Sequence, residues 1–148
     1  MTSETERPKE ILLVEDNPAD ARLVAEALKE GKVAKKLNHV VDGVEAMDYL
    51  RKVGKYKDAP SPDLILLDLN LPKKDGREVL AEVKADENLK RIPVVVLTIS
   101  RLEEDIMKSY NLHANCYIAK PLELNDFFKV VKSIEEFWLT NIVKLPPK

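Results

Sequence analysis

A short run of apolar residues, 64–67, ends directly in the carboxylate of Asp68. Consecutive apolar side chains without polar alternation are typical of a strand that is covered on both faces, as in the middle of a parallel sheet. Ligands of open parallel sheets bind at the carboxyl ends of the strands. The sequence therefore predicts a buried strand over residues 63–68, with Asp68 at the edge where a ligand can reach it.

Similar runs recur along the chain and alternate with segments in which apolar residues follow helical spacing. The expected strands are residues 11–14, 37–41, 63–68, 92–97 and 116–118. The expected helices contain residues 21–28, 44–50, 79–83, 102–110 and 124–139. This alternation favours an α/β fold with a parallel sheet and right-handed crossovers. The simplest arrangement is a flavodoxin-like, doubly wound sheet of five strands in the order 2-1-3-4-5, with five helices.

The length of 148 residues suits a single domain with its own core. Residues 1–8 are polar and are expected to form a disordered lead, which leaves 9–148 as one domain with an apolar extension from about residue 140. The single cysteine, Cys116, and the lack of a signal or membrane-spanning segment favour a cytoplasmic protein. A net charge of −2 gives no reason to expect binding to nucleic acid or to a membrane.

Polar groups stand at the ends of four of the expected strands, although the strands themselves are apolar. These groups are Glu15, Asp16, Asp68, Thr98 and Lys120. In the predicted strand order the first and third strands are neighbours, so the three carboxylates are expected to meet at one edge of the sheet.

Three carboxylates in one pocket repel each other, and a bound divalent cation would offset this repulsion. Oxygen ligands with room for water suit Mg²⁺. We expect Asp16 and Asp68 to bind the metal directly and Glu15 to act through a water molecule. The backbone carbonyl of Asn70 could complete the ligand set.

The remaining polar groups fit phosphoryl transfer. Lys120 supplies a positive charge that can hold a phosphate, and Thr98 offers a hydroxyl donor to a phosphoryl oxygen. The carboxylate of Asp68 can itself accept a phosphoryl group and form an acyl phosphate. The metal and Lys120 would neutralise charge during an in-line transfer. No general base is evident, which argues against fast hydrolysis.

This set of residues resembles the receiver domain of two-component response regulators. The resemblance depends on five polar positions, in order, at the strand ends, and it covers nearly the whole chain. It implies that Asp68 is the phosphoacceptor and that Asp16, Asp68 and the Asn70 carbonyl bind Mg²⁺. It further implies that Thr98 is the switch hydroxyl and Lys120 the phosphate-binding lysine.

Residues 68–80 and 114–121, with the ending Phe137-Trp138-Leu139, are similar to the small stand-alone regulators encoded beside bacterial and cyanobacterial phytochromes. That similarity implies a phosphodonor sensor histidine kinase of the phytochrome class. It also places Tyr117 at the aromatic switch position of the family, although packing in the core is an alternative role for this residue. The few residues after the last expected helix leave no room for an effector domain, so the output is expected to come from binding, a change of dimer or onward phosphotransfer.

The last expected helix carries more apolar residues than one face can bury. Those expected to face the sheet are Leu124, Phe127, Val131, Ile134 and Trp138. Either the end of the chain folds back over the others, or this surface meets a partner. We expect a homodimer through the last helix and the neighbouring strand, as the resemblance also implies. The candidate interface residues are Val130, Phe137, Trp138 and Leu139.

Two other functions fit parts of the pattern. A Mg²⁺-dependent phosphohydrolase with an aspartyl nucleophile is the main alternative, but such enzymes often carry a second acid two residues after the nucleophile, where this chain has Asn70. A nucleotide or flavin binder of the same fold is the third possibility. No Gly-rich phosphate loop follows Val14, which argues against it.

Overall fold

The structure is a computed structural model that describes residues 8–31, 33–98, 116–119 and 123–144. Its centre is a five-stranded sheet in the order β2-β1-β3-β4-β5, in which all neighbouring strands are parallel. The strands are β1 (Lys9–Val14), β2 (Lys35–Val40), β3 (Leu64–Asp68), β4 (Val94–Thr98) and β5 (Cys116–Ala119). The predicted strand order and fold class are therefore confirmed, with strand ends shifted by one or two residues.

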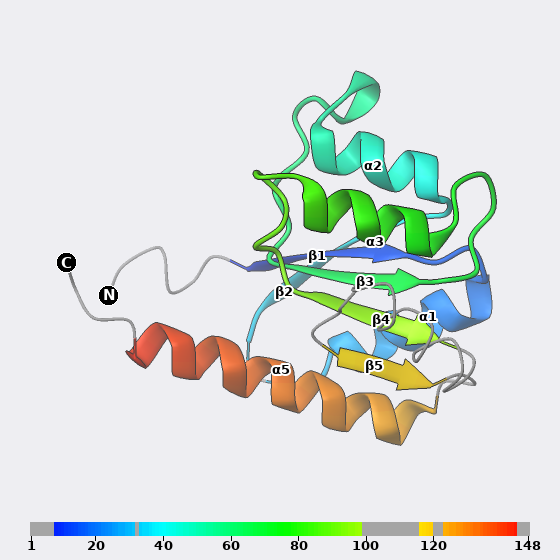
Figure 1. The fold of residues 1–148 in the computed structure, drawn as a ribbon. Helices are drawn as coiled ribbons and strands as arrows, with labels where there is room; N and C mark the ends of the chain where they lie inside the picture. Colours follow the sequence, from blue (N-terminus) through cyan, green and yellow to red (C-terminus); the bar gives the residue numbers. More distant parts are fainter. Residues whose placement is uncertain (1–7, 32, 99–115, 120–122, 145–148) are drawn as a thin grey trace.

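Helices cover both faces of the sheet (Figure 1). In the described ranges they are α1 (Pro18–Leu28), α2 (Gly43–Arg51), α3 (Gly76–Ala85) and α5 (Leu124–Lys144), and a 3₁₀ turn, η2 (Gly54–Tyr56), follows α2. Helices α2 and α3 lie on one face, and α1 and α5 lie on the other (Figure 1). None of the helices in the described ranges is both long and apolar enough to cross a membrane.

Two of the sequence predictions concern residues that the structure does not describe. They are the helix expected over residues 102–110 and all but the last residue of the lead expected over residues 1–8. The last helix differs from the prediction in length, because α5 continues through Lys144. Residues 140–144 therefore extend this helix.

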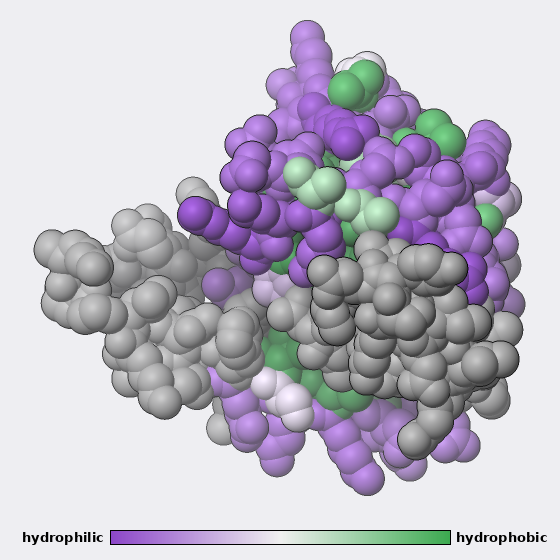
Figure 2. All heavy atoms as spheres, viewed as in Figure 1, coloured by the Kyte–Doolittle hydropathy of each residue, from purple (hydrophilic) through white to green (hydrophobic). Residues whose placement is uncertain are grey.

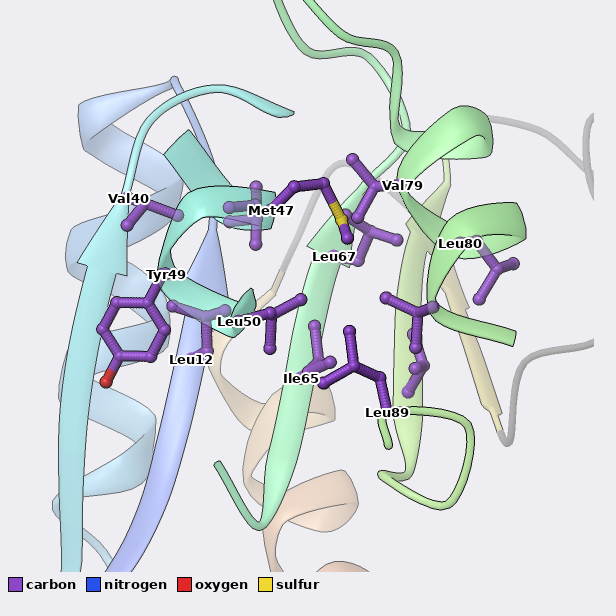
Figure 3. Packing of buried hydrophobic residues seen from close by; sticks show 14 of the residues in the cluster. Leu12, Val40, Met47, Tyr49, Leu50, Ile65, Leu67, Val79, Leu80 and Leu89 are labelled. Atoms are coloured by element: carbon purple, nitrogen blue, oxygen red, sulfur yellow. The ribbon is translucent and has the colours of Figure 1, made fainter. Parts of the chain in front are cut away.

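Side chains of the central strands alternate between two hydrophobic clusters, one on each face of the sheet. Leu12, Val14, Ile65 and Leu67 pack beneath α2 and α3 (Figure 3). Ile11, Leu13, Leu64 and Leu66 pack against α1 and α5. The run 64–67 is buried on both faces, as predicted. Each such side chain contributes about 1.5–3 kcal/mol when it is fully buried.

The helix starts are fixed by side-chain caps. The Asn17 side chain accepts hydrogen bonds from the N–H groups of Ala19 and Asp20, and Pro18 occupies the first helical position. Asp75 and Glu78 form a reciprocal capping box at the start of α3. Helix α1 therefore begins at Pro18, ahead of the apolar residues 21–28 that predicted it.

Two apolar residues of the predicted helices are exposed, and one of them, Leu124, is a residue that the helical spacing predicts to face the sheet. Leu124 is 40% exposed and Val44 is 43% exposed. Both lie in the first turn of a helix, and the buried faces are formed by later turns. Phe127 and Val131 are buried as predicted and Ile134 is partly buried, while the side chain of Trp138 lies outside the described residues.

A buried ion pair between Lys35 and Glu135 ties α5 to β2. The two side chains are 4% and 8% exposed. The Lys35 ammonium also donates to the carbonyl oxygens of Glu30 and Val33, both at 2.9 Å, so all three of its N–H groups have acceptors. The Glu135 carboxylate accepts a further hydrogen bond from the Val33 N–H at 3.2 Å.

The absence of a side chain at Gly31 leaves room for the Glu135 carboxylate of this pair. A Cβ atom at Gly31 would collide with the carboxylate of Glu135, and the backbone there has a φ of 100°. Sequence reasoning missed the pair, because a lysine at the start of a strand and a glutamate in a distant helix carry no local signal of contact.

We predict that Lys35→Met lowers the free energy of unfolding by about 3–5 kcal/mol, because it leaves the Glu135 carboxylate buried without its cation. Urea denaturation at neutral pH measures this loss. Adding Glu135→Gln to Lys35→Met is expected to recover most of it, since no uncompensated charge remains. Lys36→Met, at the exposed neighbouring position, is the control and is expected to cost less than about 0.5 kcal/mol. Equal losses for the two single variants would contradict the role of the pair.

Candidate functional site

Three carboxylates meet at the carboxyl ends of the neighbouring strands β1 and β3. Glu15, Asp16 and Asp68 each offer an oxygen, and these oxygens all lie within 4.8 Å of one another. Glu15 and Asp68 are buried, whereas Asp16 is exposed. The pairing of β1 with β3 therefore brings together the three acids that the predicted strand order placed at one edge.

The Glu15–Asn17 segment is held by hydrogen bonds on several sides. The Glu15 N–H donates to the Val40 carbonyl oxygen at 3.1 Å, and the Glu15 carboxylate accepts from the Asn17 N–H at 3.2 Å. The backbone oxygen of Glu15 lies 2.7 Å from Nε2 of His39. Because Asn17 also caps α1, this segment is bound both to the helix that follows it and to β2.

Asp68 is the last residue of β3 and is 2% exposed. Its Oδ1 atom accepts a hydrogen bond from the Asn70 N–H at 3.0 Å. The next residue, Leu69, continues the sheet contact by donating its N–H to the Leu97 carbonyl at 3.3 Å. The Asp68 side chain is therefore oriented by the turn that follows it. Asn70 itself is exposed, and its carbonyl remains a predicted ligand.

The segment after Asp68 is packed closely at both ends. A Cβ atom at Gly76 would collide with the Asp68 carbonyl oxygen and would lie 2.6 Å from Cα of Leu69. The Gly76 N–H donates to the Leu69 carbonyl at 3.0 Å. Only glycine fits here, because the first turn of α3 is pressed against the end of β3. Nothing in the local sequence around Gly76 indicates this contact with the site, so sequence reasoning missed it.

Lys73 and Lys74 connect the same segment to α2 and α3. Lys73 adopts a left-handed backbone with a φ of 67°, and its ammonium lies 3.6 Å from the Asp42 carboxylate. Lys74 forms an ion pair with Glu82 of α3. The backbone of Lys74 also occupies the space that a Cβ atom on Gly43 would fill. The segment that leaves Asp68 is therefore braced by both neighbouring helices.

The other predicted site residues lie on β4 and β5 or just beyond them. Thr98 is the last residue of β4 and pairs with Ala119 of β5, while Tyr117 pairs with Val96. Strand β4 is the neighbour of β3, so the backbone brings Thr98 to the same edge as Asp68. The side chains of Thr98 and Tyr117, and the whole of Lys120, lie outside the described residues.

The acidic cluster has the donor chemistry of a divalent cation site. It offers oxygen ligands only, from three carboxylates, which suits hard cations such as Mg²⁺. Asp16 is exposed, so one of the three carboxylates is accessible to water. The residues present therefore fit a metal that would offset their mutual repulsion.

Comparisons with known proteins agree with this geometry. Residues 11–132 match the family described as response regulator receiver domain. The chain is 56% identical over 142 residues to "Response regulator Rcp1" of Synechocystis sp., which covers 96% of this chain and 97% of that protein.

Two solved structures are similar to the whole fold. The phosphorylated cyanobacterial phytochrome response regulator RcpA has a TM-score of 0.79 and 61% identity, covering 91% of this chain and 96% of that one. The Mn²⁺-bound form of response regulator Rcp1 has a TM-score of 0.78 and 57% identity, and the match covers 95% of this chain and 100% of that one.

We predict that Gly76→Ala lowers the free energy of unfolding by about 1–3 kcal/mol, because the added methyl group collides with the backbone of Asp68 and Leu69. It is also expected to weaken Mg²⁺ binding, since relief of the collision displaces Asp68. Chemical denaturation and calorimetric titration measure the two effects. Gly54→Ala is the matched control: nothing lies within 4 Å of its Cβ position, so only the positive φ of 63° opposes it, at about 1 kcal/mol. Unchanged Mg²⁺ affinity in Gly76→Ala would contradict the link.

Proposed function

Because this chain belongs to the response regulator receiver domain family, we propose that it accepts a phosphoryl group on Asp68, with Mg²⁺, from a sensor histidine kinase of the phytochrome type. The chain is a signalling regulator that acts as a phosphorylation-dependent switch. The observation that carries the residue assignment is the convergence of Glu15, Asp16 and Asp68 within 4.8 Å.

The metal ligands that we propose are Asp16, Asp68 and the backbone carbonyl of Asn70, with Glu15 acting through a water molecule. Asp16 is exposed, which supports a direct role because its carboxylate is accessible to a hydrated metal ion. When bound, Mg²⁺ supplies positive charge to the phosphoryl oxygens. Response regulator Rcp1 has been solved in a Mn²⁺-bound form, which supports binding of a divalent cation by this chain.

The chemistry assigned to Asp68 is phosphoryl transfer to a carboxylate. A carboxylate oxygen of Asp68 attacks the phosphorus atom of a phosphohistidine, and the phosphorus–nitrogen bond breaks in line. The imidazole leaves with the electron pair of that bond and takes up a proton. Lys120 pairs with a phosphoryl oxygen, and the hydroxyl of Thr98 donates to another. Hydrolysis of the resulting acyl phosphate is expected to be slow, because no general base is evident among the site residues that the structure describes.

The switch that we propose uses Thr98 and Tyr117. Phosphorylation draws the Thr98 hydroxyl toward the phosphate, and the Tyr117 ring moves into the space that this leaves. The direct pairing of β4, which ends in Thr98, with β5, which contains Tyr117, supports this coupling. A change at Asp68 then reaches the surface of β5 and α5.

The similarity to RcpA, a cyanobacterial phytochrome response regulator, supports a phytochrome-type kinase as the phosphodonor. We place the exchange in the cytoplasm, which the single cysteine of the chain favours. The phosphohydrolase alternative is not favoured, because the family match covers a regulator and Asn70 occupies the position of the second acid that such enzymes often carry.

We further propose a homodimer through α5. This helix runs past the edge of the sheet toward the C-terminus (Figure 1). The described surface in Figure 2 is mostly hydrophilic, with scattered apolar residues. The apolar end of α5 is therefore the better candidate for an interface. Val130, which is partly buried, and Phe137, Trp138 and Leu139 are the residues we assign to it.

We predict that incubation with Mg²⁺ and acetyl phosphate adds one phosphoryl group to the protein, because the Asp68 carboxylate is the nucleophile. Intact-mass spectrometry measures the added mass, and Asp68→Asn is expected to remove it. Asp63→Asn is the control, since this carboxylate lies at the opposite end of β3 and accepts the Glu10 N–H. Persistent labelling of Asp68→Asn would overturn the assignment, and steady turnover of a phosphate ester would favour the phosphohydrolase.

The homodimer predicts that Phe137→Glu with Leu139→Glu shifts the protein to a monomer, because two charges would be buried in the interface. Sedimentation velocity with and without acetyl phosphate measures the association state. Ser133→Glu, at an exposed position of the same helix, is expected to leave the dimer intact. A wild-type protein that stays monomeric in both conditions at high concentration would contradict the proposal.

A further inference from the structure

We infer that His39 is a positioning residue for the acidic cluster, because its imidazole fixes the peptide group that joins Glu15 to Asp16. The inference rests on the proposed function, since it concerns the Mg²⁺ site of that function. We assign His39 no contact with the metal or with the phosphoryl group. It acts through the backbone that carries two of the three carboxylates.

The contact itself is short and has one possible direction. Nε2 of His39 lies 2.7 Å from the backbone oxygen of Glu15. A carbonyl oxygen can only accept, so Nε2 carries the hydrogen and donates it. The contact therefore requires the ring to carry a hydrogen on Nε2.

The end of β2 explains why a side chain is needed at this place. Val14 pairs with Val40, and the Glu15 N–H continues the ladder by donating to the Val40 carbonyl at 3.1 Å. In a continued parallel ladder, the N–H two residues beyond Val40 would donate to the Glu15 carbonyl. Strand β2 stops at Val40, however, and the chain turns into the cap of α2. His39 supplies the donor to Glu15 from within the strand.

The backbone that follows His39 forms its hydrogen bonds with the start of α2. The Val41 N–H donates to the Glu45 carboxylate at 3.1 Å, a bond that lowers the pKa of Glu45. The Asp42 side chain accepts from the Glu45 N–H at 2.7 Å. The turn that follows β2 is thus engaged with the helix, and the imidazole provides the contact to β1.

The peptide held by His39 sets the direction of two of the three carboxylates. Its carbonyl belongs to Glu15 and its N–H belongs to Asp16, so its orientation sets the direction in which both side chains leave the backbone. The Glu15 carboxylate is fixed further by the Asn17 N–H at 3.2 Å. Asp16 is exposed, and its carboxylate depends on this backbone for its place near Asp68.

The position of His39 separates this role from a packing role. The residue is exposed, and it belongs to neither of the two hydrophobic clusters. Its neighbour Asn38 donates to the Glu10 carboxylate at 3.0 Å, away from the acidic cluster. Removal of the imidazole should therefore change the geometry of the Glu15–Asp16 peptide while leaving the core intact.

The test is calorimetric titration of the full-length protein with Mg²⁺ alone, at one fixed pH and ionic strength. His39→Phe keeps a ring of similar size but removes the donor, and His39→Ala repeats the removal without the ring. Both are expected to raise the Kd for Mg²⁺ about three- to tenfold, the effect of one lost hydrogen bond on a ligand-bearing peptide. His39→Gln is expected to restore wild-type affinity, because the amide nitrogen of Gln reaches the place of Nε2. Lys36→Ala, at another exposed position of β2, controls for general effects on the strand.

A readout of the peptide itself accompanies the titration. Amide exchange at Asp16 is expected to speed up in His39→Phe and His39→Ala and to return to normal in His39→Gln. Thermal unfolding midpoints within about 2 °C of the wild type show that the fold is retained, consistent with an exposed site.

The outcomes separate this inference from the proposed function. Wild-type protein that binds Mg²⁺, with equal affinity in His39→Phe and His39→Ala, would overturn the positioning role and leave the Mg²⁺ site standing. Weakened binding in His39→Gln to the same extent would also overturn it. Wild-type protein that fails to bind Mg²⁺ would overturn the proposed metal site itself.

Discussion

The parallel pairing of β1 with β3 is the contact on which the rest of this structure depends. It places Val14 beside Leu67 and so brings the residues that follow β1 to the carboxylate that ends β3. The apolar side chains on both strands make the pairing favourable, and the acids at their ends make it costly. A hydrophobic core therefore holds three like charges together, and a cation relieves the repulsion between them. Stability and metal affinity are in this way properties of the same pair of strands.

The sequence was sufficient for the fold because the information there is local and repeated. Buried runs such as 64–67, alternating with helical spacing, fix the fold class, and the crossover rules then leave few strand orders. The meeting of Glu15, Asp16 and Asp68 follows directly from that order. Leu124 and Val44 show the limit of periodicity, because spacing alone does not tell where along its length a helix meets the sheet.

What the sequence could not show are the contacts between distant segments. The hydrogen bond from His39 to Glu15, the closeness of Gly76 to Asp68 and the pair of Lys35 with Glu135 each join elements that are far apart or separated by a turn. A histidine, a glycine or a lysine looks ordinary in its own segment. The sequence therefore identified the residues that carry the chemistry, but it did not identify the residues that hold them in place.

The Lys35–Glu135 pair has a mechanical consequence for α5. Glu135 lies near the middle of a helix that runs from Leu124 to Lys144, roughly 16 Å from the first residue and 13 Å from the last at 1.5 Å per residue. A rigid helix that is held at this point by a buried ion pair would pivot about it. A push on the first turn, which follows β5 and the edge of the sheet that carries the site, would swing the far end by a similar amount in the opposite direction. The far end is the part of the helix that extends beyond the sheet, so a small displacement near the site would be delivered, reversed, to the outermost surface of the protein.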